Sequence, residues 1–266
     1  MNAKNGTIPF PGTDMDYIRF GSGKKTLIML PGLGDGLRSM RGTALPFSMM
    51  YRSFARDFTV YAFSRLNQLP QGYSTRDMAR DVATAMDALG IDKAHVFGVS
   101  MGGMIAQHLA ADYPERVDRL VLTVTSARPN PTLISAISLW REQALQDDHA
   151  ALMDSNLRLI YSDGYYQKYK HLVPAMGRLT KPSSYDRFLV QAEACLTHDA
   201  YHRLPCIQAP TLVIGGEQDK CLGGEASREI ARQIPGAELK MYSQWGHGLY
   251  DEEKGFNQLV LNYLNA

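Results

Sequence analysis

The chain alternates between short apolar runs and longer stretches with helical spacing, and this alternation constrains its fold more than any other feature. The apolar runs are rich in Val, Ile, Leu, Phe and Tyr, and they span residues 24–31, 57–63, 94–99, 119–124, 211–215 and 238–242. Such runs are typical of strands buried on both faces. Helical spacing covers residues 74–90, 101–112, 225–234 and 255–264. Because parallel neighbours need crossover connections, the sequence predicts an α/β fold: a mostly parallel, doubly wound sheet with helices on both faces.

One stretch interrupts this rhythm. Between residues 128 and 204 there is no buried-strand run, and Tyr, Leu and Met at helical spacing are mixed with charges. We therefore expect a core made of residues 1–127 and 205–266, with residues 128–204 inserted as a helical cap. Aromatic side chains of the insertion, such as Trp140, Tyr161 and Phe188, are each expected to pack mainly within the cap itself.

Charge and cysteine content exclude several classes of function. The chain has 28 Lys plus Arg and 27 Asp plus Glu, a net charge of +1. A near-neutral chain has no field that would gather nucleic acid or an anionic membrane. There is also no apolar run of about 18 residues that would span a bilayer. The three cysteines, Cys195, Cys206 and Cys221, form no C-x-x-C pair, which favours a reducing compartment. We expect a cytoplasmic protein with no nucleic-acid or membrane partner.

A Gly-x-Ser-x-Gly sequence lies between a predicted strand and a predicted helix. It reads Gly98-Val99-Ser100-Met101-Gly102. The glycines permit a sharp turn that places the serine hydroxyl above the sheet. The helix start also brings the Met101 N–H near the place where negative charge develops during acyl transfer. The motif predicts Ser100 as a nucleophile.

A serine nucleophile needs a base, and a carboxylate that orients the base. Of the seven histidines, only His247 follows a late predicted strand, in a loop flanked by glycines. The carboxylate is expected at a strand end between Ser100 and His247 in the chain. The strand at residues 211–215 is followed by Glu217 and Asp219. We expect Asp219 to be the acid because the loop needs a few residues to turn back, with Glu217 as the alternative.

A second oxyanion donor is expected from the loop after an early strand. This loop reads Pro31-Gly32-Leu33-Gly34-Asp35-Gly36. The Leu33 N–H is the predicted partner of the Met101 N–H, and its neighbours Gly32 and Gly34 are the alternatives.

The order PGLGDG, GVSMGG, insertion, GGEQD and GHG resembles the α/β-hydrolase fold superfamily over nearly the whole chain. Residues 75–122 are most similar to its capped carboxylesterase, enol-lactonase and cofactor-free haloperoxidase branches. The resemblance implies Ser100 as nucleophile, Asp219 as acid and His247 as base. Two stretches depart from the family pattern. Pro31-Gly32 replaces His-Gly in the oxyanion loop, and residues 63–68 (FSRLNQ) replace Asp-x-Arg-Gly-x-Gly. The second departure puts any transfer of substrate specificity in doubt.

Together these features predict a serine hydrolase that cleaves a small carboxylic ester or lactone through an acyl-enzyme, without metal or organic cofactor. The same three residues also serve carbon–carbon bond hydrolysis, perhydrolysis and acyl transfer. A ligand-binding module with low turnover is the non-enzymatic alternative. Arg128 or Arg158 could meet a carboxylate of a small-molecule substrate. The sequence leaves the oligomeric state open.

Overall fold

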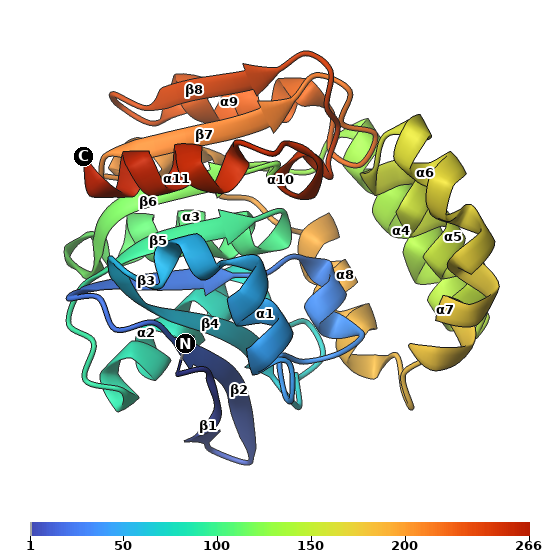
Figure 1. The fold of residues 1–266 in the computed structure, drawn as a ribbon, viewed down its shortest axis with the longest axis horizontal. Coiled ribbons are helices and arrows are strands. Elements are labelled where there is room, and N and C mark those ends of the chain that lie inside the picture. The colour runs from blue at the N-terminus through green and yellow to red at the C-terminus, as the bar shows by residue number, and fades with distance from the viewer. Residues whose placement is uncertain (1) are drawn as a thin grey trace.

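A computed structural model describes residues 2–266, in which a central sheet of eight strands lies between two layers of helices (Figure 1). The strands are β1 (Lys4–Phe10), β2 (Thr13–Phe20), β3 (Lys25–Leu30), β4 (Phe58–Leu66), β5 (Ala94–Val99), β6 (Val117–Thr123), β7 (Thr211–Gly216) and β8 (Glu238–Tyr242). Their order in the sheet is β1-β2-β4-β3-β5-β6-β7-β8. The pairs β1–β2 and β2–β4 are antiparallel, and every pair from β4 to β8 is parallel. The predicted fold class is confirmed.

Helices cover both faces of this sheet. The helices of the described chain are α1 (Ala44–Met50), α2 (Thr75–Ala88), α3 (Met101–Asp112), α4 (Pro131–Leu145), α5 (His149–Ile160), α6 (Asp163–Tyr169), α7 (Val173–Leu179), α8 (Asp186–Leu196), α9 (Gly224–Gln233), α10 (Leu249–Glu252) and α11 (Phe256–Asn265). One apolar core joins α2, α3 and α9 to the sheet, and a second joins α1 and α11 to the opposite face. In Figure 1, α1 and α11 lie in front of the sheet, and α2, α3 and α9 lie behind it.

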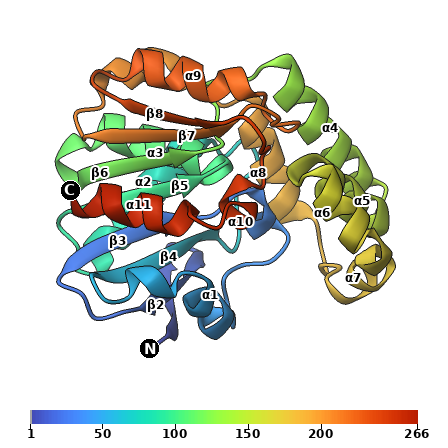
Figure 2. The same ribbon diagram turned by 45° about the horizontal axis from the view of Figure 1, so that its top comes forward.

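Five helices, α4 to α8, lie between β6 and β7 in the chain. Several of them begin at residues whose side chains accept a hydrogen bond from the first turn: Asn130 for α4, Asp148 for α5 and Ser162 for α6. Such caps satisfy backbone N–H groups that a helix start leaves unpaired. Helices α4 to α7 form a group set off from the carboxyl ends of the parallel strands, and α8 lies between this group and the core (Figures 1 and 2).

The antiparallel β1–β2 hairpin lies outside the six strands that the sequence predicted. In β1 only Ile8 is buried, so this edge strand carries no apolar run. Among residues 2–266, no helix is long and apolar enough to cross a membrane.

Candidate active site

Ser100 occupies the turn between β5 and α3 in a strained backbone conformation. Its φ is +55° and its ψ is −122°, a region that costs a non-glycine residue about 1–3 kcal/mol. Two neighbours hold it there. Its N–H donates to the Thr123 carbonyl at 2.9 Å, and its carbonyl accepts from the Thr125 hydroxyl at 2.8 Å. The surrounding structure therefore fixes this turn.

The glycines on either side of Ser100 are required by close backbone approach. A Cβ on Gly98 would lie 2.5 Å from the Gly102 carbonyl oxygen. A Cβ on Gly102 would overlap the Leu30 carbonyl at the end of β3. The spacing of glycines in the motif thus follows from how tightly α3 packs against β3 and β5.

Ser100, His247 and Asp219 come together in one hydrogen-bonded line. The Ser100 Oγ lies 3.0 Å from His247 Nε2, and His247 Nδ1 lies 2.8 Å from Asp219 Oδ2. Because a carboxylate only accepts, Nδ1 carries the proton and Nε2 accepts from the serine hydroxyl. Both His247 and Asp219 are buried, whereas Ser100 is partly exposed. This arrangement can move a proton from the serine hydroxyl to the imidazole.

The second carboxylate oxygen of Asp219 is also satisfied. It accepts from the backbone N–H groups of Cys221 and Leu222, each at 2.8 Å. These two donors fix the carboxylate against His247, and no sequence pattern indicates them. The alternative acid, Glu217, instead pairs with the exposed Arg228.

Two backbone N–H groups begin helical turns beside Ser100. Met101 is the first residue of α3, and Leu33 is the first residue of the short 3₁₀ turn Leu33–Gly36. Neither N–H donates a hydrogen bond to another residue within the described chain. Gly32 lies against the nucleophile, since a Cβ there would be 3.3 Å from Ser100 Cβ. Both N–H groups are thus free to donate, which is what an oxyanion site requires.

A buried polar network holds this loop in place. The Asp35 carboxylate accepts from the Ser64 hydroxyl at 2.7 Å, from the Arg65 N–H at 3.0 Å and from the Arg187 guanidinium at 2.5 Å. The Arg65 guanidinium donates to the Pro31 carbonyl, and burial lowers its pKa to about 10. Sequence reasoning missed Asp35, Arg65 and Arg187, because they come together only through pairing of β3, β4 and α8. The network joins the loop that carries Leu33 to a helix of the insertion.

The loop that carries His247 is also bonded to the insertion. The Gly248 N–H donates to the Ile160 carbonyl at 2.6 Å. The Ser162 N–H and hydroxyl donate to the Glu252 carboxylate at 3.0 Å and 2.5 Å. The α5–α6 junction is therefore fixed to the segment that follows the histidine.

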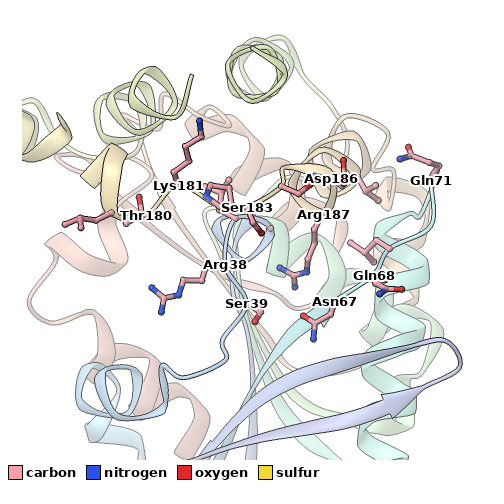
Figure 3. A pocket seen from close by; sticks show the side chains of 17 residues that line it. Arg38, Ser39, Asn67, Gln68, Gln71, Thr180, Lys181, Ser183, Asp186 and Arg187 are labelled. Carbon is pink, nitrogen blue, oxygen red and sulfur yellow. Dashed lines mark hydrogen bonds between the residues drawn. The ribbon is translucent and has the colours of Figure 1, made fainter. Parts of the chain in front are cut away.

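A polar hollow of about 660 Å³ lies beside the Asp35–Arg187 pair. Figure 3 shows Arg38, Asn67, Lys181 and Arg187 around it. No residue of the Ser100–His247–Asp219 line borders this hollow. The hollow is therefore separate from the Ser100–His247–Asp219 line.

One group of side chains has the composition of a metal site. The ligand atoms of Asp219, Cys221 and His247 lie within 4.8 Å of one another. However, both Asp219 oxygens and both His247 ring nitrogens already make hydrogen bonds. Burial also raises the pKa of the Cys221 thiol, which keeps it protonated and a poor ligand. The geometry serves proton transfer better than metal binding.

The two arginines that could meet a substrate carboxylate have other partners. Arg128 bonds Glu229 and stacks over the Tyr201 ring at 4.1 Å. Arg158 bonds Asp154 and the Tyr166 hydroxyl.

Comparison with known proteins identifies a family and similar folds. A sequence model of the family described as "alpha/beta hydrolase fold" matches residues 25–254. A 2-hydroxy-6-oxononadienedioate/2-hydroxy-6-oxononatrienedioate hydrolase of Klebsiella pneumoniae is 30% identical over 268 residues, covering 92% of this chain and 88% of that protein. A Pseudomonas savastanoi protein provisionally named a carbamate hydrolase is 27% identical over 208 residues, covering 74% of this chain and 78% of its own. The enol-lactonase of Burkholderia xenovorans LB400 superimposes with a TM-score of 0.82 at 23% identity, over 98% of this chain and 100% of that one.

Proposed function

The chain belongs to the α/β-hydrolase family and is a hydrolase, and on this premise we propose that it cleaves a small carboxylic ester or lactone with Ser100 as nucleophile. The observation that carries the proposal is the hydrogen-bonded line from Ser100 Oγ through His247 to Asp219, at 3.0 Å and 2.8 Å. A serine hydroxyl becomes nucleophilic when an oriented imidazole accepts its proton.

In the first half of the proposed reaction, Ser100 Oγ attacks the substrate carbonyl carbon while His247 Nε2 takes the hydroxyl proton. Asp219 holds the imidazole in the required tautomer and stabilises the imidazolium that forms. The N–H groups of Leu33 and Met101 bind the carbonyl oxygen as it becomes negative. Each stabilises the transition state by about 3 kcal/mol. His247 then gives its proton to the leaving alkoxide.

In the second half, water attacks the acyl-enzyme. His247 takes one proton from the water, and the hydroxyl adds to the acyl carbon. The bond from that carbon to Ser100 Oγ then breaks, and His247 returns the proton to the serine. The carboxylic acid leaves and the enzyme is restored.

Residues 128–204 are proposed to act as a cap over this site, between core segments 1–127 and 205–266. Support comes from the two places where the insertion is bonded to the site loops. Arg187 of α8 pairs with Asp35, and Ile160 accepts from Gly248. The cap would thereby share in shaping the substrate cavity.

Carbon–carbon bond hydrolysis is a second candidate, because the Klebsiella relative is named a hydrolase of 2-hydroxy-6-oxononadienedioate, a compound that contains no ester bond. A dioate substrate brings carboxylates that need cationic partners. In this chain two guanidinium groups lie beside the oxyanion loop. Arg187 pairs with Asp35, and the buried Arg65 donates to the Pro31 and Phe63 carbonyls. Because both groups already have partners within the protein, they favour an uncharged ester or lactone over a dicarboxylate.

The test compares wild type, Ser100→Ala and the control Ser183→Ala, which alters an exposed serine. Hydrolysis of 4-nitrophenyl esters, of lactones and of a vinylogous 1,5-diketone acid is measured beside labelling by a fluorophosphonate probe. We expect labelling and ester or lactone turnover in wild type and Ser183→Ala, with turnover lower by about four to six orders of magnitude in Ser100→Ala. Retained turnover in folded Ser100→Ala would refute the covalent mechanism. Labelling with turnover of the diketone acid alone would favour the second candidate, and neither signal in folded wild type would favour a binding module.

A further inference from the structure

A second, smaller cavity lies between α1 and the core sheet. Its volume is about 150 Å³. Its walls come from the oxyanion loop, the end of β5, helix α1 and the helix after the catalytic histidine, and include Gly32, Val99, Phe47, Tyr51, Phe97 and Tyr250. It is formed by core elements and shares no wall residue with the insertion.

This cavity adjoins the nucleophile. Val99 directly precedes Ser100 in the chain, and Gly32 lies against the serine side chain. A Cβ on Gly32 would be 3.3 Å from Ser100 Cβ and 3.8 Å from Ser100 Oγ. Tyr250 follows His247 by three residues in α10. Segments that carry the proposed nucleophile, base and oxyanion donor therefore each supply a wall.

The chemistry of the walls selects an apolar occupant. No lining residue carries a charged side chain. Phe97 is buried, and the rings of Phe47 and Tyr51 pack with centroids 4.7 Å apart. Burial raises the pKa of the Tyr51 and Tyr250 hydroxyls, so both phenols stay neutral. A cavity near this volume with apolar walls holds a molecule of about the size of benzene, which sets a limit of roughly six carbons.

We propose that this cavity is the acyl subsite of the enzyme and takes a compact apolar acyl group of up to about six carbons. The inference rests on the proposed function. In the acyl-enzyme the acyl carbon is bonded to Ser100 Oγ, so its substituent must lie beside Ser100 and the oxyanion loop. Gly32 and Val99 border the cavity at that place. Helix α1 of the core would thus limit the length of the acyl group that the enzyme accepts. The insertion would contact other parts of the substrate.

The test replaces Phe47 with smaller and with larger side chains. Phe47→Ala and the milder Phe47→Leu enlarge the cavity, and Phe47→Trp reduces it. The matched control is Met49→Ala, on the same helix, because Met49 is 60% exposed and does not border the cavity. For each protein kcat/KM is measured on 4-nitrophenyl esters from acetate to decanoate, and on acetates of alcohols of increasing length. Thermal unfolding reports whether each variant is folded.

We expect wild type to prefer acyl groups of about four to six carbons. Phe47→Ala and Phe47→Leu should raise decanoate hydrolysis at least about 10-fold, and Phe47→Trp should lower hexanoate hydrolysis about 10-fold while acetate changes less than about 2-fold. Met49→Ala should match wild type.

Two results would overturn the assignment and are distinguishable. In the first result, fluorophosphonate labelling and acetate turnover persist, but the folded Phe47 variants keep the acyl-length profile of wild type or change only the alcohol-length profile. The cavity is then not the acyl subsite, and the proposed function stands. If wild type shows neither labelling nor turnover, the proposed function fails and the subsite fails with it.

Discussion

The ion pair between Asp35 and Arg187 offers a direct test of how the insertion is joined to the oxyanion loop. The Asp35 side chain is fully buried and that of Arg187 is 13% exposed. In Arg187→Met the carboxylate keeps the Ser64 hydroxyl and the Arg65 backbone N–H but loses its salt bridge. Removing one partner of a buried pair costs about 3–5 kcal/mol, because the remaining charge stays buried and unpaired. We expect Arg187→Met to lower the free energy of unfolding by this amount.

A double-mutant cycle measures the interaction itself. Urea unfolding is followed for wild type, Asp35→Leu, Arg187→Met and the double variant, which removes both charges and should lose less than the two single changes together. The control cycle uses Glu225 and Arg232, a pair whose side chains are 69% and 60% exposed. Its coupling should stay below about 1 kcal/mol. A coupling at Asp35–Arg187 no larger than in the control would refute the reasoning.

Three further predictions concern the site and its support. Gly102→Ala places a Cβ against a β3 carbonyl and should cost about 3 kcal/mol in urea unfolding, whereas Gly164→Ala, where a Cβ meets nothing within 4 Å, should not destabilise; equal costs would contradict the packing argument. Asp219→Asn should lower kcat about 10⁴-fold with the circular dichroism spectrum unchanged, because His247 is no longer held in the tautomer that carries its proton on Nδ1. A kcat near that of wild type would exclude Asp219 as the acid. Burial lowers the pKa of His108 to about 4 and of His198 to about 3, below the unfolded value of about 6.5. The unfolded chain therefore binds more protons below pH 6.5, and each histidine should remove roughly 1 kcal/mol of stability per pH unit as the pH falls toward 4. Urea unfolding at pH 7, 6 and 5 should show a smaller slope in His108→Gln, and an unchanged slope would argue against this cause.

The parallel strands were predictable because burial on both faces leaves a local signature. In β5 and β7 every residue is buried, which produces an unbroken apolar run. The edge hairpin lacks this signature. Its second strand even buries Asp16, which the Ser39 hydroxyl and the Asn67 amide satisfy from distant parts of the chain. A charged residue in a buried position breaks the local pattern, so sequence period alone could not find that strand.

The candidate site also has parts that the sequence predicts and parts that it does not. The place of Ser100 at a sharp turn was predictable because the turn, its glycines and the following helix are contiguous in the chain. Placement of His247 and Asp219 needed only the rule that parallel strands end at one edge of the sheet. The network behind the oxyanion loop was not predictable. Asp35 and Arg187 are 152 residues apart in the chain, and a lone Asp in a glycine-rich loop is usually a turn residue.

The insertion is bonded to the loops of the candidate site at two places. Arg187 fixes α8 to the oxyanion loop, and Ile160 fixes the α5–α6 junction to the loop of His247. Both bonds support loops that carry a proposed oxyanion donor and the proposed base. Substrate length, in contrast, is proposed to depend on Phe47 and Val99, which belong to the core and touch neither bond. Under this proposal, changes at these core walls alter the accepted acyl group without moving the proposed oxyanion donors or the proposed base. For this reason the activity in a relative's name does not fix the acyl group that this chain accepts.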